Sequence, residues 1–253
     1  MKDSQLIGTA HLELQVNKYQ MQSNYFFPLN LTIDPVERLR FTSTLLPDLI
    51  EQFAQSDSDL THVGSRMEHQ FHSTIDAINA VLAPIGLVVY KPTMFMSSGN
   101  IVGKNIHCDG MVDQAGNVGM LEARINLYEM SLGQNTIEWW DHLPNRIPID
   151  DGNLPWWKIP RLIENLSGAH PFVICLPPFR HDLRNGTLSW DQIPIPNFST
   201  TIVSPSAFVR TNLPHHIVQS NGVRVTLSLS IAFQSGELIG VWEHAQNNIN
   251  QLQ

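Results

Sequence analysis

In the segment RVTLSLSIAF, residues 224–233, polar and apolar side chains alternate from Arg224 to Ile231. Because successive side chains of a β-strand point to opposite faces, this pattern predicts a strand with one polar and one apolar face. Arg224, Thr226, Ser228 and Ser230 share the polar face. A guanidinium and several hydroxyls would then point together into the polar interior of a barrel, while the apolar face packs on a core. The chain is thereby constrained to a mainly antiparallel β fold.

Short segments of β character, separated by turns, fill the chain from residue 86 onward. The turns include DQAGN at 113–117, SLGQN at 131–135 and QSNG at 219–222, and such residues favour tight reversals. The strands predicted are 87–96, 101–107, 118–130, 134–140, 171–177, 200–211, 213–218 and 223–233. About eight antiparallel strands suit a jelly-roll barrel, the double-stranded β-helix of cupin-like proteins.

The N-terminal part of the chain combines strands with two helices. Strands are predicted at 10–16 and 25–33, and Pro28 puts the second of them at a sheet edge or a bend. The clearer helix has apolar residues at helical spacing from Val63 to Leu82. We expect the helices to support the β domain from one side.

The other predicted helix begins at Asp34 and runs to about residue 55. Asp34 can cap its N-terminus, and Glu37 stands at the spacing of a capping box. Pro47 lies inside the segment, where it would bend or divide the helix.

We therefore expect a single domain over residues 1–253, of α+β class, mainly β with N-terminal helices. Its parts are N-terminal strands and supporting helices at 1–85, a jelly-roll core at 86–233, and a C-terminal tail at 234–253. Two long loops, at 141–170 and 178–199, are rich in Pro, Asn, Asp and Trp. Loops of this length in a compact domain usually carry function.

Charge and cysteine content exclude several classes of function. The chain has 15 basic and 23 acidic residues, a net charge of −8, and no Lys/Arg-rich stretch. We therefore expect no nucleic-acid partner, because phosphate binding needs clustered cations. No apolar run is long enough to span a membrane. With only Cys108 and Cys175, a reduced cytoplasmic protein is the simpler expectation.

Two short motifs carry candidate metal ligands. His107 and Asp109 are two residues apart, so on a strand their side chains point to the same side and can reach one metal ion. Far along the chain, Pro214 is followed by His215 and His216. A histidine there could complete a set of two imidazoles and one carboxylate, which leaves three coordination positions open and is characteristic of non-haem Fe(II) oxygenases.

A third motif, Arg224-x-Thr226, follows nine residues after His215. In this order, H-x-D, a distal P-H-x-hydrophobic and R-x-[S/T], the motifs resemble those of the Fe(II)/2-oxoglutarate-dependent dioxygenase family. The resemblance covers roughly residues 87–233. It implies a cupin-like barrel and an enzyme that uses Fe(II), 2-oxoglutarate and O2.

The resemblance also implies a role for each matching residue. Iron would be bound by His107, Asp109 and His215, which would also be the catalytic residues. Arg224 would bind the distal carboxylate of 2-oxoglutarate, with Thr226 assisting. The family pattern places the ligand directly after the proline, which favours His215, and His216 would face the other way.

Further residues are weaker candidates for the cosubstrate and the substrate. Asn126 and Tyr128 share one face of the strand after the H-x-D motif, where this family often contacts 2-oxoglutarate. Arg124 and Arg210 could bind a carboxylate of the substrate, and Trp140 could line its pocket. A wet barrel mouth explains Asn126 and Tyr128 equally well, whereas surface positions for the two arginines and a core position for Trp140 are the more frequent arrangements.

We expect a hydroxylase acting on a small molecule, such as an amino acid, or on a side chain of a peptide or protein, with release of succinate and CO2. Desaturation or another oxidation is equally compatible with the motifs. Two alternatives stay open. One is a cupin-like metal-binding protein, or an oxygenase that does not use 2-oxoglutarate. The other is a non-catalytic scaffold. The substrate and the oligomeric state cannot be deduced from these motifs.

Overall fold

The structure is a computed structural model of the chain. It describes residues 23–55, 60–63, 69–98, 106–112, 118–131, 135–141, 162–163, 172–175, 193–219 and 223–248. The strand predicted at 10–16 and most of the two predicted loops lie outside the described residues. Within them the fold is mainly β with few helices, and every strand pair is antiparallel.

Six strands form the largest sheet. Their order is β1 (Phe26–Leu29), β11 (Ser206–Arg210), β6 (Ala123–Ser131), β13 (Val223–Phe233), β3 (Leu87–Ser98) and β2 (Leu60–Val63). β1 lies at the edge, as Pro28 predicts, because proline lacks the N–H that an inner strand donates. β13 lies inside the sheet, between β6 and β3.

Two smaller sheets lie on one side of the large sheet. One has the order β10 (Phe198–Thr201), β7 (Asn135–Trp139) and β12 (His215–Gln219). The other has the order β5 (Val118–Met120), β4 (Cys108–Val112), β9 (Phe172–Cys175) and β8 (Leu162–Ile163). A single bridge between His107 and His215 joins the start of β4 to β12.

The two faces of β13 differ as its alternation predicts. Val225, Leu227 and Leu229 are fully buried in the main hydrophobic core. Arg224 and Thr226 are also buried, but on the opposite face. The large sheet therefore has an apolar outer face and, along β6 and β13, a polar inner face.

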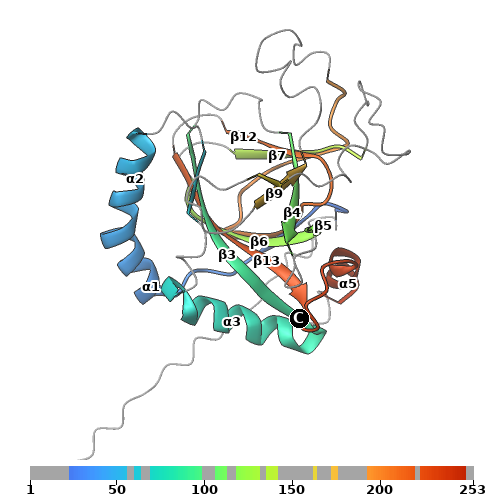
Figure 1. Ribbon diagram of the computed structural model, residues 1–253, viewed down its shortest axis with the longest axis horizontal. Helices are drawn as coiled ribbons and strands as arrows, with labels where there is room; N and C mark the ends of the chain where they lie inside the picture. Colours follow the sequence, from blue (N-terminus) through green and yellow to red (C-terminus); the bar gives the residue numbers. More distant parts are fainter. Residues whose placement is uncertain are drawn as a thin grey trace, which may run out of the picture.

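Helices cover the apolar face. They are α1 (Pro35–Arg40), α2 (Leu46–Gln55), α3 (His72–Leu82) and α5 (Val241–Asn248). Residues of α2, α3 and α5, and Phe41 directly after α1, contribute to the same core cluster. In Figure 1, α1, α2 and α3 follow the outer side of β3 and β13, away from β7 and β12. No helix in the described part of the chain combines the length and apolarity needed to span a lipid bilayer.

The predicted helix over residues 34–55 is divided rather than merely bent. A π-helical turn, η1 (Phe41–Leu45), separates α1 from α2. Pro47 cannot donate to the carbonyl four residues earlier, and its ring crowds that carbonyl. The hydroxyls of Thr42 and Ser43 add to this effect by donating to Arg38 and Leu39 carbonyls, at 3.0 and 2.7 Å.

Two other predictions for the helices need correction. The predicted helix from Val63 begins only at His72, because Leu60–Val63 pairs with β3 as strand β2. A single 3-10 turn, η3 (Ala83–Ile85), ends the helix at Gly86, whose φ of +72° suits a residue without a side chain. The expected C-terminal tail contains α5, where Val241 and Trp242 are fully buried.

Predicted strand boundaries differ from the observed ones in two places. The predicted segment 118–130 is broken at residues 121–122 into β5 and β6, and the segment 200–211 is divided between β10 and β11. Most of the strand predicted at 101–107 lies outside the described residues, which resume at residue 106 just before β4 (Cys108–Val112).

Candidate metal centre

Two distant segments bring three metal-binding side chains together. His107 and His215 are cross-strand partners: each backbone N–H donates to the other's carbonyl, at 3.0 and 2.9 Å. Directly opposed residues of antiparallel strands point to the same side, so the two imidazoles face each other. Asp109, two residues further along, points to that side as well.

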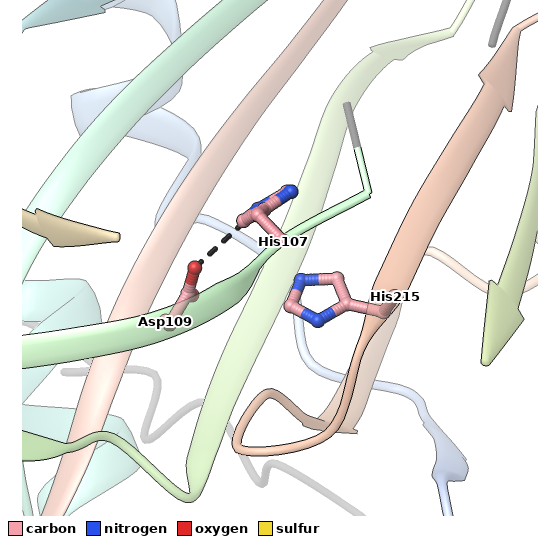
Figure 2. Close-up of side chains that lie close together, drawn as sticks. All are labelled: His107, Asp109 and His215. Carbon is pink, nitrogen blue, oxygen red and sulfur yellow. Dashed lines mark ion pairs between the residues drawn. The ribbon is translucent and has the colours of Figure 1, made fainter. Parts of the chain in front are cut away.

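The geometry fits one metal ion. One ligand atom from each of His107, Asp109 and His215 lies within 4.8 Å of the others. The Nε2 atom of His107 is 3.4 Å from Oδ1 of Asp109, the contact dashed in Figure 2, and the two imidazole centroids are 4.4 Å apart. Two imidazoles and one carboxylate on one side of an ion form the facial set that leaves three positions open. This is the only such group within the described residues.

His215 is prepared for metal binding by its own surroundings. Burial and the nearby His107 lower the pKa of His215 to about 3, so its ring is neutral at neutral pH. Its Nδ1 lies 2.9 Å from the carbonyl oxygen of Leu213. In a neutral ring this contact places the proton on Nδ1 and leaves the lone pair of Nε2 for a metal.

Asp109 is held as an anion although it is only 5% exposed. Burial alone would raise the pKa of its carboxyl, but the guanidinium of Arg124 and the hydrogen bond from His107 hold it well below the usual range. Nε of Arg124 donates to Oδ2 of Asp109 at 2.6 Å. The side chain of His107 is 23% exposed and that of Asp109 is 7% exposed, so the site is most open beside His107.

His216 has a different environment. Its Nδ1 lies 3.4 Å from Oε2 of Glu138, its partner on the neighbouring strand β7. Only His215 joins the group that could bind a metal. The favoured member of the predicted pair is therefore the one that the fold brings to His107 and Asp109.

A second polar group lies on the inner face of the large sheet. Arg224 and Thr226 on β13 are 6% and 2% exposed, and Thr226 pairs with Tyr128 on β6. Four of their buried atoms have no hydrogen-bond partner among the described residues: Nε and Nη1 of Arg224, Oγ1 of Thr226 and the Tyr128 hydroxyl. Burying such groups unpaired is costly, which indicates a site for a polar ligand.

The charges of this group favour an anion. Burial lowers the pKa of Arg224, and no carboxylate forms an ion pair with it among the described residues. Burial also raises the pKa of Tyr128 to about 12, so its hydroxyl stays protonated and can donate. A guanidinium with two donor-bearing hydroxyls beside it matches a carboxylate.

Hydrogen bonds extend from the metal group (His107, Asp109 and His215) along the inner face of the large sheet as far as Asn126, on the same strand as Tyr128 of the anion group (Arg224, Thr226 and Tyr128). Arg124 holds Asp109 and also donates through Nη1 to Oγ of Ser228, at 3.4 Å. The Ser228 hydroxyl in turn donates to Oδ1 of Asn126, at 2.6 Å. Asn126 thus lies on the polar face as predicted, between Arg124 and Tyr128, with its side-chain oxygen bonded to Ser228.

Two predicted substrate contacts lie elsewhere. Arg210 is directed towards α5: its Nη2 is 3.4 Å from Oε1 of Glu243, and its guanidinium lies 5.7 Å from the Trp242 ring centroid. Trp140 is 2% exposed, and its Nε1 donates to the carbonyl of Pro194 at 2.7 Å. Within the described residues, neither side chain joins the metal group or the anion group.

Sequence reasoning did not predict the contacts that Arg124 makes with Asp109 and Ser228. Arg124 was predicted to bind a substrate carboxylate, but its carboxylate partner is Asp109. The available signal was its position on the same strand face as Asn126 and Tyr128. That signal places it on the polar face of the strand, yet a strand pattern cannot tell which neighbouring strand supplies the counter-charge.

Comparison with known proteins gives structural likenesses only. No protein-family model and no curated protein matches the chain. Similar solved structures include HygX from Streptomyces hygroscopicus with iron bound, at 9% identity and TM-score 0.44, over 85% of this chain and 84% of HygX. Another HygX structure has nickel and 2-oxoglutarate bound, at 8% identity and TM-score 0.41, over 84% of each chain.

AviO1 from Streptomyces viridochromogenes Tue57 is similar over 90% of this chain and 98% of its own, at 11% identity and TM-score 0.41. The proteins resembling this chain thus include one solved with iron and with 2-oxoglutarate. Because every TM-score is below 0.5, the function has to be inferred from the residues of the site itself.

Proposed function

We propose that the protein is an Fe(II)- and 2-oxoglutarate-dependent oxygenase. The observation that carries the proposal is the presence of two buried polar groups, one on β4 and β12 of the small sheets and the other on the inner face of the large sheet. One group can hold a metal ion on three side chains, and the other presents an unpaired guanidinium. A ligand that chelates the metal at one end and offers a carboxylate at the other fits both groups.

The donor set supports iron. Two imidazoles and one carboxylate bound on one side leave room for a chelating ligand and for O2. Iron bound there would couple oxidative decarboxylation of 2-oxoglutarate by O2 to oxidation of a substrate, with release of succinate and CO2. The residues of the chain contribute the metal ligands, their orientation and the exclusion of water around Asp109 and His215.

The position of the anion group relative to the metal group supports a short dicarboxylate as the ligand. On β6, Arg124 beside the metal group and Tyr128 beside Arg224 are four residues apart, roughly 13 Å of strand. Long side chains at both ends fill part of that length. A five-carbon 2-oxo diacid suits the remainder, because its 2-oxo acid end can chelate the metal and its distal carboxylate can reach Arg224 and Thr226.

The proposals on the detailed fold, the reaction type and the substrate rest on the sequence motifs. We expect the sheets to form a double-stranded β-helix and the reaction to be hydroxylation of a C–H bond. The substrate would be a small molecule such as an amino acid, or a peptide or protein side chain, and it would enter beside the more exposed His107. The two cysteines and the absence of a basic patch favour a cytoplasmic enzyme without a nucleic-acid partner.

Anaerobic spectroscopy tests this proposal directly. Adding Fe(II) and then 2-oxoglutarate to the native protein should give a weak metal-to-ligand charge-transfer band in the visible, which requires direct chelation. Arg224→Lys should raise the 2-oxoglutarate concentration needed for half of the band, by about tenfold or more, since the paired donors are lost. Arg210→Lys, on the opposite face of the large sheet, is the matched control and should titrate like the native protein.

Two outcomes separate the parts of the proposal. If the native protein binds Fe(II) but gives no band, the protein does not use 2-oxoglutarate in this way, and a cupin-like metal protein becomes the better account. If the band appears but Arg224→Lys titrates like the native protein, only the role of Arg224 is wrong.

A further inference from the structure

A buried ion pair connects the candidate metal centre to the large sheet. Asp109 belongs to β4, which pairs with β5 and β9, whereas Arg124 belongs to β6. Their side chains are 7% and 2% exposed, and Nε of Arg124 lies 2.6 Å from Oδ2 of Asp109. Such a short charge-assisted bond between strands of different sheets strongly restricts the orientation of the carboxylate.

Because of this bond, the two carboxylate oxygens of Asp109 have different contacts. Oδ2 accepts from Arg124, while Oδ1 faces Nε2 of His107 at 3.4 Å, on the side where the ligand atoms converge. A carboxylate held in this way offers one oxygen to a metal. Binding through both oxygens would use one of the three positions that a chelating 2-oxo acid and O2 require.

Arg124 is itself held in place. Its Nη1 donates to Oγ of Ser228 at 3.4 Å, and its guanidinium carbon lies 5.7 Å from the centroid of the Phe95 ring. The guanidinium therefore contacts side chains of both β13 and β3, which restricts its orientation. A fixed donor can impose its orientation on a neighbouring carboxylate, whereas a mobile donor would follow it.

We propose that Arg124 is a positioning residue that keeps Asp109 a one-oxygen ligand by holding Oδ2, and thereby preserves the third open position at the metal. This inference rests on the proposed metal centre, and goes beyond it by assigning a residue that binds neither metal nor cosubstrate. Its role depends on the N–H donor at the Nε position rather than on the positive charge alone.

Two nearly isosteric variants separate the donor from the charge. Arg124→Gln places an amide nitrogen at the same number of bonds from the backbone as Nε, without the charge. Arg124→Met fills similar space with neither donor nor charge. The probe is Mn(II) alone, without 2-oxoglutarate, and the measurement is the number of metal-bound waters from electron paramagnetic resonance in ¹⁷O-enriched water.

The native protein and Arg124→Gln should retain three bound waters, the number that a facial set of three protein ligands leaves. Arg124→Met should have one fewer, because the released Oδ2 takes that position. Arg210→Met, which removes an arginine from the other face of the sheet, should keep the native number.

Every other outcome either supports or overturns the role proposed for Arg124. The inference is overturned if Arg124→Met has the native water number, or if Arg124→Gln loses the same water as Arg124→Met. If Arg124→Met does not fold, Arg124→Gln decides alone: the native number supports the inference, and one water fewer overturns it. A native protein that binds no Mn(II) at His107, Asp109 and His215 would overturn the proposed function as well, which distinguishes the two failures.

Discussion

At the scale of single residues, the site depends on which side of a strand a side chain takes. His215 and His216 are adjacent, and the alternation of β12 sends the first to His107 and Asp109 and the second to Glu138. Both are buried, at 5% and 2% exposure, so burial does not distinguish them. The backbone bridge between His107 and His215 does, because directly paired residues share a face.

This difference makes the two histidines a matched pair for mutation. His215→Ala should weaken Fe(II) binding by well over tenfold, because even residues that only support a ligand contribute about 10- to 100-fold. His216→Ala should bind Fe(II) like the native protein. Anaerobic equilibrium dialysis measures both, and retained binding in His215→Ala would exclude it as a ligand.

A second residue pair tests the unpaired hydroxyl in the anion group. Thr226 has a buried hydroxyl without a partner among the described residues, whereas the buried Thr211 hydroxyl donates to the Leu121 carbonyl at 2.8 Å. Thr226→Val should raise the free energy of unfolding of the ligand-free protein by about 1 kcal/mol, because an unsatisfied buried hydroxyl is removed. Thr211→Val should lower it by about as much.

The same Thr226 variant should lose affinity for the cosubstrate. Replacing a hydroxyl that donates to a carboxylate costs about 1.5–3 kcal/mol, or roughly tenfold or more in the 2-oxoglutarate dissociation constant. Urea denaturation and calorimetry on the Mn(II)-loaded protein measure the two effects. If Thr226→Val destabilises the protein as much as Thr211→Val does, the hydroxyl has a structural partner and no ligand role.

At the scale of elements, Glu37 connects two helices instead of closing its own. Its predicted capping-box contact to Asp34 is absent: the Asp34 N–H donates to the Thr74 hydroxyl at 2.9 Å. The Glu37 carboxylate instead accepts from the N–H groups of Ser73 and Thr74 and from the Thr74 hydroxyl, at 2.7, 3.0 and 2.6 Å. A side chain of α1 thus caps the first turn of α3.

Replacing that carboxylate should therefore affect stability rather than the metal centre. Glu37→Gln should lower the free energy of unfolding by about 1–2 kcal/mol, because it replaces one accepting oxygen with a donor facing other donors. Asp48→Asn, at an exposed acidic position in α2, is the control and should change it by less than about 0.5 kcal/mol. Equal effects of the two changes would show that the cap does not stabilise the packing of α1 on α3.

Sequence patterns predicted the elements best where one period dominates. The alternation of β13 was read correctly on both faces, because each face meets a uniform environment: helices outside and polar side chains inside. The helix predicted from Val63 begins later than expected, because residues 60–63 pair with β3 at the edge of the large sheet. A single apolar residue at the end of a helical pattern, such as Val63, can belong either to the helix or to a strand that precedes it.

The candidate site was predictable only in part, for a related reason. Motif spacing predicted that His107, Asp109 and His215 would come together, and the fold brings their ligand atoms within 4.8 Å of one another. The contacts of Arg124 and Arg210 depend on which segment packs against each of them. Asp109 and Glu243 reach them from 15 and 33 residues away, and no local pattern contains that information.

At the scale of the whole molecule, the two faces of the large sheet differ in role: one packs the hydrophobic core, and the other carries buried polar groups of the candidate site. Its outer face is packed with apolar side chains beneath the helices, which supplies the core. Its inner face retains Arg124, Arg224, Thr226 and Tyr128, a set of buried polar groups that a fold selected only for stability would avoid. Figure 1 shows this division, with α1, α2 and α3 on the outer side and the small sheets on the other.

The most direct measurement is an anaerobic crystal structure of the protein with Mn(II), in place of Fe(II), and 2-oxoglutarate. We predict Mn(II) bound by His107, Asp109 and His215, the 2-oxo acid end of 2-oxoglutarate chelating it, and the distal carboxylate on Arg224. A metal bound by other residues, or 2-oxoglutarate bound away from the metal or from Arg224, would contradict the central claim.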